Sequence, residues 1–188
     1  MRFLLVSLLL LLPHATGTLQ HQVDLEPMLH DDKALQKLTI LYQYEPRANH
    51  GFQMFYVRGD GSLILQAFPE RPMATRNIPT CRNRVNQEKV KEIVRLMIQR
   101  HFWDLPERSF IFLSVSQSEE TLEIHTIAVD DGITEARRNF GVGTYAGKQE
   151  SMPADFAVVE EQLKQLKEFT LHTPERPCHL APAIKFWK

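Results

Sequence analysis

Residues 52–68 read FQMFYVRGDGSLILQAF, and this stretch decides the fold. Residues 52–58 and 63–68 are rich in aromatic, β-branched and aliphatic side chains, and the sequence Gly59-Asp60-Gly61-Ser62 lies between them. Glycine and aspartate tolerate the positive φ that tight turns require, so the stretch predicts a β-hairpin. Residues 38–44 have a similar composition and predict a strand that precedes this hairpin.

Two later stretches keep the apolar period of a helix. Asn86 can cap a helix that runs from residue 86 to residue 101, and Glu88 lies in its first turn. The apolar face of this helix consists of Val90, Ile93, Val94, Met97 and Ile98. Residues 153–169 repeat the pattern and predict a second helix.

Three more strands are predicted, at residues 110–115, 121–129 and 133–140. Residues 69–84 hold three prolines and predict a long loop or an irregular edge, and a glycine-containing loop is expected from residue 141 to residue 153. The order β-β-β-α-β-β-β-α predicts an α+β domain with one antiparallel sheet and both helices packed on one face.

The first 17 residues have the parts of a secretory signal peptide. Arg2 supplies the positive charge, residues 3–12 form an apolar run interrupted only by Ser7, and small residues precede a cleavage site after Gly17. The apolar run is shorter than the about 20 residues that a membrane span needs. We therefore expect a secreted or periplasmic protein with no transmembrane helix in its mature chain.

Composition indicates a single folded domain. The chain has 188 residues, of which 43% are hydrophobic, and this argues against intrinsic disorder. We expect a lead-in segment at residues 18–37, one domain at residues 38–170 and a proline-rich C-terminal tail at residues 171–188. The formal net charge of -1 gives no global field that would attract nucleic acid.

The two cysteines, Cys81 and Cys178, are predicted to form a disulfide, because an exported chain with an even number of cysteines has this as its default. The alternative is two unpaired thiols. No paired Cys or His motif accompanies them, so no metal site is expected.

One segment suggests a binding function. Four arginines lie within 14 residues, and no acidic residue follows Glu70 among them; they are Arg71, Arg76, Arg82 and Arg84. Guanidinium groups bind phosphate, sulfate and carboxylate in a bidentate manner. An anionic glycan, a lipid headgroup or an acidic protein surface would fit such a segment, and the alternative is a solvated loop whose charge is incidental.

No catalytic motif or cofactor motif is evident. His125 lies in a predicted strand beside Glu123 and could serve a small hydrolase, with Ser114 or Ser116 as the nucleophile. The chain lacks a Gly-x-Ser-x-Gly elbow, and strand alternation places Glu123 and His125 on a face that we interpret as solvated. The sequence thus favours a non-catalytic binding or inhibitor-like module without a cofactor, and a hydrolase centred on His125 is the alternative.

The sequence from Tyr56 to Leu63 resembles the Y-G-D-G-x-V hairpin of a family of uncharacterised bacterial extracytoplasmic domains. In that family a helix, a Phe-x-x-Leu element and a further hairpin and helix follow, and Phe102 and Leu105 are similarly placed here. The similarity spans residues 38–169. It implies the fold and the extracytoplasmic location, and it implies no activity.

Overall fold

A computed structural model describes residues 23–46, 51–68, 77–106, 123–145, 148–184 and 186. Its helices are α1 (Pro27–His30), α2 (Asp32–Lys37), α3 (Gln87–Gln99) and α4 (Ala154–His172), with a 3₁₀ helix η1 (Phe102–Asp104). Its strands are β1 (Thr39–Glu45), β2 (Phe52–Arg58), β3 (Ser62–Phe68), β4 (Asn77–Arg84), β5 (Glu123–Asp130), β6 (Glu135–Tyr145), β7 (Lys148–Glu150) and β8 (His179–Pro182).

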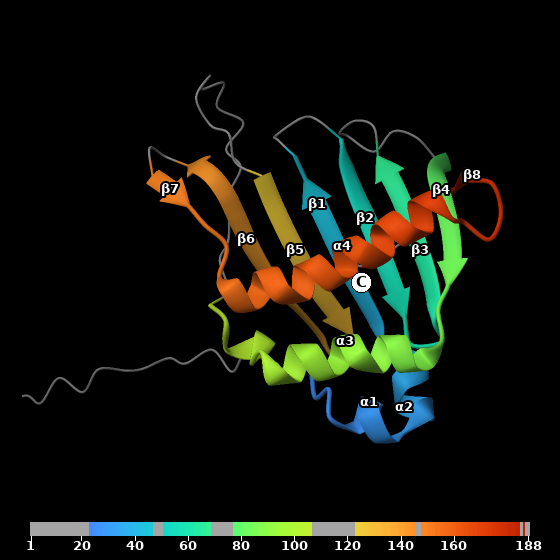
Figure 1. Cartoon of the computed structure of the whole chain (residues 1–188), viewed down its shortest axis with the longest axis horizontal. Helices are drawn as coiled ribbons and strands as arrows, with labels where there is room; N and C mark the ends of the chain where they lie inside the picture. The colour runs from blue at the N-terminus through green and yellow to red at the C-terminus, as the bar shows by residue number, and fades with distance from the viewer. Residues whose placement is uncertain are drawn as a thin grey trace, which may run out of the picture.

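The described strands form one sheet in the order β7-β6-β5-β1-β2-β3-β4-β8, and every pairing is antiparallel. Figure 1 shows α3 and α4 crossing the same face of this sheet. The predicted α+β class with an antiparallel sheet is therefore confirmed. Residues 1–22, which include the predicted signal peptide, and the predicted strand at residues 110–115 lie outside the described residues.

The turn between β2 and β3 packs against the backbone of two other segments, α2 and the residues before α3. Gly61 has a φ of 86°, in the left-handed region that favours glycine. A Cβ atom on Gly59 would lie 1.5 Å from the carbonyl oxygen of Leu35, and one on Gly61 would lie 2.1 Å from that of Val85. The backbone N–H of Gly59 also donates to the carbonyl of Leu38. Only glycine fits at these two positions, so the hairpin that the sequence predicts also holds α2 and the segment before α3 in place.

The sheet has a buried cluster on each face. Phe55 and Val57 of β2 point toward the helices and join a core that includes Val90, Ile93 and Leu163. The alternate residues of the same strand, Met54 and Tyr56, belong to a second cluster on the opposite face, which also contains Phe186. The central strands therefore bury apolar side chains on both faces of the sheet.

Helix α3 confirms the predicted helix closely. The Asn86 side chain accepts a hydrogen bond from the backbone N–H of Lys89 (2.9 Å), as an N-cap does. The residues that it buries are Val90, Ile93, Val94 and Met97. The second predicted helix is present as α4 and extends one turn beyond its expected end.

The expected loop at residues 69–84 is wrong for its second half, because residues 77–84 form β4. Burial alternates along most of this strand. Pro79 lies opposite Leu180 of the short edge strand β8. A proline removes one donor from a ladder, and the pairing of β4 with β3 begins at the next residue, Thr80, and continues to Arg84. The loop expected after residue 141 is also partly wrong, since β6 continues to Tyr145.

A disulfide and several hydrogen bonds hold the C-terminal tail against the sheet. The predicted Cys81–Cys178 disulfide is present and joins β4 to the segment before β8. At the end of β8 and just beyond it, the buried side chain of Gln66 donates to the carbonyl of Pro182 (3.0 Å) and accepts from the N–H of Ile184 (2.9 Å). The hydroxyl of Tyr56 donates to the carbonyl of Ile184 (3.3 Å).

Among the described residues, no helix has the length and apolar character that crossing a bilayer requires.

We predict that Ile93→Asp unfolds the domain, because an unpaired carboxylate buried in the core costs several kcal/mol. Ile93 is 1% exposed. The exposed neighbour Arg95 is the control, and Arg95→Gln should change stability by less than about 0.5 kcal/mol. Urea unfolding monitored by circular dichroism would measure both variants. Equal stability of the two would show that the core face of α3 is misassigned.

Removal of the disulfide should cost about 2–4 kcal/mol, because the bridge closes a long loop in the unfolded chain. The two cysteines are 97 residues apart in sequence. Cys81→Ser with Cys178→Ser should show this loss in urea unfolding, and hydrogen exchange should rise most at residues 179–184. A double variant as stable as the native chain would contradict the prediction.

Candidate functional site: the arginine face of the sheet

Two of the four predicted binding residues, Arg82 and Arg84, lie on β4 and are exposed. The other two, Arg71 and Arg76, lie outside the described residues. Arg82 and Arg84 are two positions apart on one strand, so their side chains share a face of the sheet and their Cα atoms are about 7 Å apart. The predicted arginine segment thus presents part of its charge from a regular strand and not from a loop.

A third arginine, Arg58, joins them through the register of the strands. Val57 of β2 pairs with Leu63 of β3, and Leu63 pairs with Asn83 of β4. The next residues along these strands are Arg58, Ser62 and Arg84, so these three lie level with one another, and Arg58 and Arg84 are two strand spacings, about 10 Å, apart.

These three arginines lie on the face opposite the helices. Val57 and Leu63 point toward the helices, and strand alternation turns Arg58 and Arg84 the other way. Arg82 lies opposite Ile64, a member of the second cluster. We call Arg58, Arg82 and Arg84 the arginine face. In the sequence, Arg58 stands at the end of a predicted hairpin strand. That position does not show which residues of β4 lie beside it in the sheet.

The arginine face keeps its positive charge. Within the described part of the chain, none of the three guanidinium groups forms an ion pair within 4.0 Å of a carboxylate. Asp60 lies in the adjacent turn, where the charges of Arg84 and Arg58 act on it. Burial acts to raise the pKa of Asp60, but hydrogen bonds from Ser62 and the charges of Arg84 and Arg58 outweigh it and lower that pKa. The ionised carboxylate of Asp60 therefore offsets part of the charge of the guanidinium groups beside it.

The backbone beneath Arg82 and Arg84 is fixed. Residues 80–84 of β4 pair with β3, whereas β8 pairs with residues 77–80, before the two arginines. The disulfide at Cys81 lies directly before Arg82. The carbonyl of Arg82 accepts from the N–H of Glu175 (3.0 Å), and the side chain of Asn83 donates to the carbonyl of Thr173 (2.6 Å). A ligand would therefore meet a surface whose main chain needs no ordering.

His125 belongs to a separate, buried cluster beneath α4. Its Nδ1 atom contacts Oε1 of Glu160, and its Nε2 atom lies 3.8 Å from Oε2 of Glu123. The hydroxyl of Tyr42 donates to the same Oε1 of Glu160 (2.8 Å), and Lys164 pairs with Oε2 (3.0 Å). The His125 and Glu160 side chains are each 5% exposed. The interpretation of His125 as part of a solvated face is wrong, because Ile127 and Val129 share its face and place it under the helix.

The electrostatics of this cluster favour an ionised Glu160. Burial acts to raise the pKa of Glu160, but hydrogen bonding and charge interaction with His125, together with hydrogen bonds from Tyr42 and Lys164, lower it below its ordinary value. Burial first, and then the charge of Glu160, raise the pKa of Tyr42. Tyr42 therefore stays a neutral hydroxyl that donates to a carboxylate. The cluster joins α4 to β1 and β5 by charge-assisted hydrogen bonds.

The burial of His125 bears on the alternative hypothesis of a hydrolase. A carboxylate, that of Glu160, is within hydrogen-bond reach of His125, as the enzyme hypothesis requires, and the His125 side chain is 5% exposed. The serines that were considered as nucleophiles, Ser114 and Ser116, lie outside the described residues. Across those parts of the chain that are described, no group of three or more His, Cys, Asp or Glu residues could hold a metal ion.

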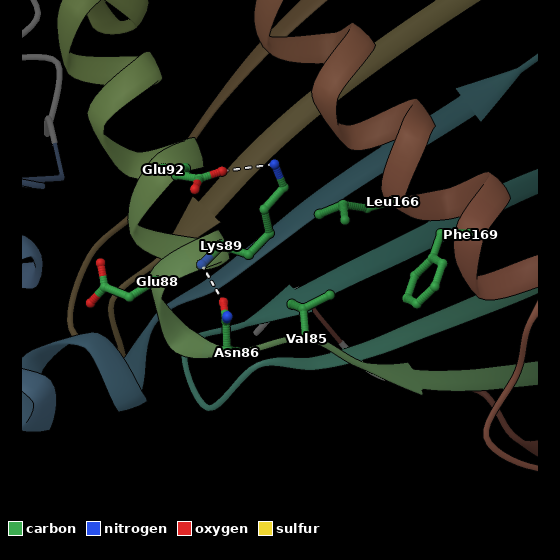
Figure 2. A pocket seen from close by; sticks show the side chains of 7 residues that line it. All are labelled: Val85, Asn86, Glu88, Lys89, Glu92, Leu166 and Phe169. Atoms are coloured by element: carbon green, nitrogen blue, oxygen red, sulfur yellow. Dashed lines mark hydrogen bonds and ion pairs between the residues drawn. The ribbon is translucent and has the colours of Figure 1, made fainter.

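A groove also runs between the start of α3 and the end of α4 (Figure 2), with a volume of about 440 Å³. Leu166 and Phe169 of α4 form one wall with Val85 below them, and Phe169 is 43% exposed. Opposite them, Lys89 and Glu92 pair with each other (2.7 Å). Because the charges at this groove are already paired, it offers apolar contact without a charge preference.

We predict that the stability contributed by Glu160 is lost in acid. A carboxyl whose pKa is lowered in the folded state stabilises it above the unfolded value of 4.5 and loses that contribution as the pH falls through the folded pKa, below 4.5. The native chain should exceed Glu160→Gln in unfolding free energy at pH 7, and the difference should shrink between pH 5 and pH 3. Urea unfolding across this range would measure it.

The exposed neighbour Glu161 provides the control for this pH dependence. Glu161→Gln should keep the pH profile of the native chain. A constant difference between the native chain and Glu160→Gln at every pH would contradict the assignment.

Comparison of the chain with models of known protein families and with curated proteins found no match.

Proposed function

We propose that this protein is an extracytoplasmic, non-catalytic binding module that holds an anionic ligand on the arginine face. The observation that carries the proposal is the gathering of Arg58, Arg82 and Arg84 on one exposed surface without carboxylate partners in ion pairs among the described residues. Two segments 24 or more residues apart in sequence contribute to it, so the cluster is a product of the fold.

The chemistry of the arginines indicates the class of ligand. Guanidinium groups are planar donors that match the oxygen pairs of phosphate, sulfate and carboxylate groups. Cα separations of about 7 Å and about 10 Å allow a ligand with several anionic groups to meet more than one arginine. Each charge-assisted hydrogen bond contributes about 1.5–3 kcal/mol, and two or three suffice for micromolar affinity after the costs of association.

The location fits this ligand class. The disulfide between Cys81 and Cys178 is compatible with an oxidising compartment outside the cytoplasm. A signal peptide cleaved after Gly17 would deliver the protein there, where anionic glycans, lipid headgroups and acidic proteins are its possible ligands. The formal net charge of the chain is -1, so attraction to such a ligand would come from this local surface.

The experiment measures retention on immobilised heparin, a sulfated polysaccharide, at increasing NaCl. The native protein should elute at a higher salt concentration than Arg82→Ala with Arg84→Ala, and adding Arg58→Ala should lower the elution point again. Lys33→Ala with Lys37→Ala is the matched control, since it removes the same charge from exposed positions on α2 and should elute with the native protein.

Two further probes separate the ligand classes. Vesicles that contain phosphatidylglycerol represent lipid headgroups, and polyglutamate represents an acidic protein surface. The probe that shows the largest difference between the native chain and the arginine variant identifies the class. If the arginine variant and the lysine control lose retention equally on all three probes, or neither loses any, the arginine face is not a binding site.

A further inference from the structure

We propose that the outer surface of α3 and α4 binds a second copy of this chain, related to the first by a two-fold axis. This inference is independent of the arginine face, which lies on the other face of the sheet. Helices α3 and α4 form a layer over one face of the sheet (Figure 1). Their outward side chains include Glu92 and Arg95, which are 56% and 45% exposed, and Phe169, which is 43% exposed.

The outer side of α3 carries a charged stripe. The residues that this helix buries are Val90, Ile93, Val94 and Met97. Positions 88, 92, 95 and 99 follow the helical spacing of four, three and four residues, and they lie on the opposite side of the helix, away from the sheet. This α3 stripe consists of Glu88, Glu92, Arg95 and Gln99. It presents both signs of charge along one line.

A two-fold axis through the middle of the α3 stripe brings opposite charges together. Two copies of α3 that pack antiparallel about this axis place Glu92 of each copy opposite Arg95 of the other, and Glu88 opposite Gln99. A parallel arrangement would instead place Glu92 against Glu92 and Arg95 against Arg95, which is repulsive. The order of the charges along the stripe therefore favours the antiparallel, two-fold arrangement.

The outer side of α4 carries a stripe with the same spacing but with no charge. It lies opposite the residues that α4 buries, which include Phe156, Val159 and Leu163. This α4 stripe consists of Val158, Gln162, Gln165 and Phe169. An antiparallel two-fold arrangement places Phe169 of each copy opposite Val158 of the other, and Gln162 opposite Gln165. The α4 stripe thus complements itself by apolar contact at its ends and by amide hydrogen bonds in its middle.

One axis serves both stripes, because they lie level with each other across the groove between the helices. Leu166 and Phe169 line that groove beside the start of α3 (Figure 2). Val158 and Gln162 line it beside Glu92 and the end of α3. The two helices therefore run antiparallel, and the middle of one stripe lies next to the middle of the other. A rotation that pairs the charges of α3 also pairs the apolar ends of α4.

The charges on this surface indicate a second copy as the partner. Within one chain, Glu92 pairs with Lys89 (2.7 Å) and Glu88 pairs with Arg95 (3.3 Å). These two acids and two bases balance, so the surface does not attract a strongly acidic or a strongly basic partner. A second copy supplies the same charges in reverse order. Each carboxylate at position 92 then gains a second cation, and the joined surface stays neutral.

The test reverses the two charges separately and measures self-association of the disulfide-bonded protein by sedimentation velocity. Glu92→Arg alone and Arg95→Glu alone should each weaken the dimer about tenfold or more. Each variant turns two ion pairs per dimer, worth about a factor of two to five apiece, into like-charge contacts. An equimolar mixture of the two variants should associate as tightly as the native protein, because positions 92 and 95 of the two different copies then carry opposite charges.

Matched controls separate this surface from a general effect of charge or exposure. Glu175→Arg and Lys33→Glu make the same reversals at exposed positions elsewhere and should leave the dimer unchanged. Phe169→Ala should weaken the dimer, whereas Leu171→Ala should not, because Leu171 is 44% exposed but lies outside the α4 stripe. Circular dichroism would check that each variant is folded. A native protein that is monomeric up to about 1 mM, or a mixture that associates no better than its two components, would overturn the proposal.

Discussion

The close contact between the β2–β3 turn and the backbone of two other segments is the constraint on which this structure depends. Gly59 lies against the carbonyl of Leu35, and Gly61 lies against that of Val85. Through these contacts one hairpin sets where the N-terminal helices end and where α3 begins. The same turn spaces Arg58 from Ser62, and the register then brings Arg84 level with both. The β2–β3 turn therefore determines both the packing of these segments and the position of the arginine face.

Local chemistry explains what the sequence could predict. The Gly-Asp-Gly turn, the apolar period and the Asn86 cap each depend on a few neighbouring residues, and the hairpin and α3 are present as expected. Strand β4 was missed because Pro79 argues against a strand when its partners are unknown. Its outer partner, β8, comes from a proline-rich segment about 100 residues later, and no local pattern indicates that pairing.

The buried histidine illustrates the second limit of sequence reasoning. Alternation along β5 separates Glu123, His125, Ile127 and Val129 from the residues between them, and both sets contain apolar and polar side chains. Which set lies under a helix depends on Glu160, 35 residues away on α4, which supplies a partner for the imidazole. A polar residue on a strand can therefore be a core residue when its partner arrives from another layer. Arg58 was overlooked for the related reason that its neighbours lie two strands away.

The recognition of the C-terminal tail by Gln66 has a consequence for how this protein can vary. The buried amide of Gln66 bonds to main-chain atoms of Pro182 and Ile184, as a neighbouring peptide group would. Main-chain atoms are the same for nearly every amino acid. Substitutions along this segment therefore leave the two bonds intact, whereas a shortened chain leaves the buried Gln66 amide with its bond to Thr80 but without these two. Selection at this end of the molecule should act on the number of residues more strongly than on their identity.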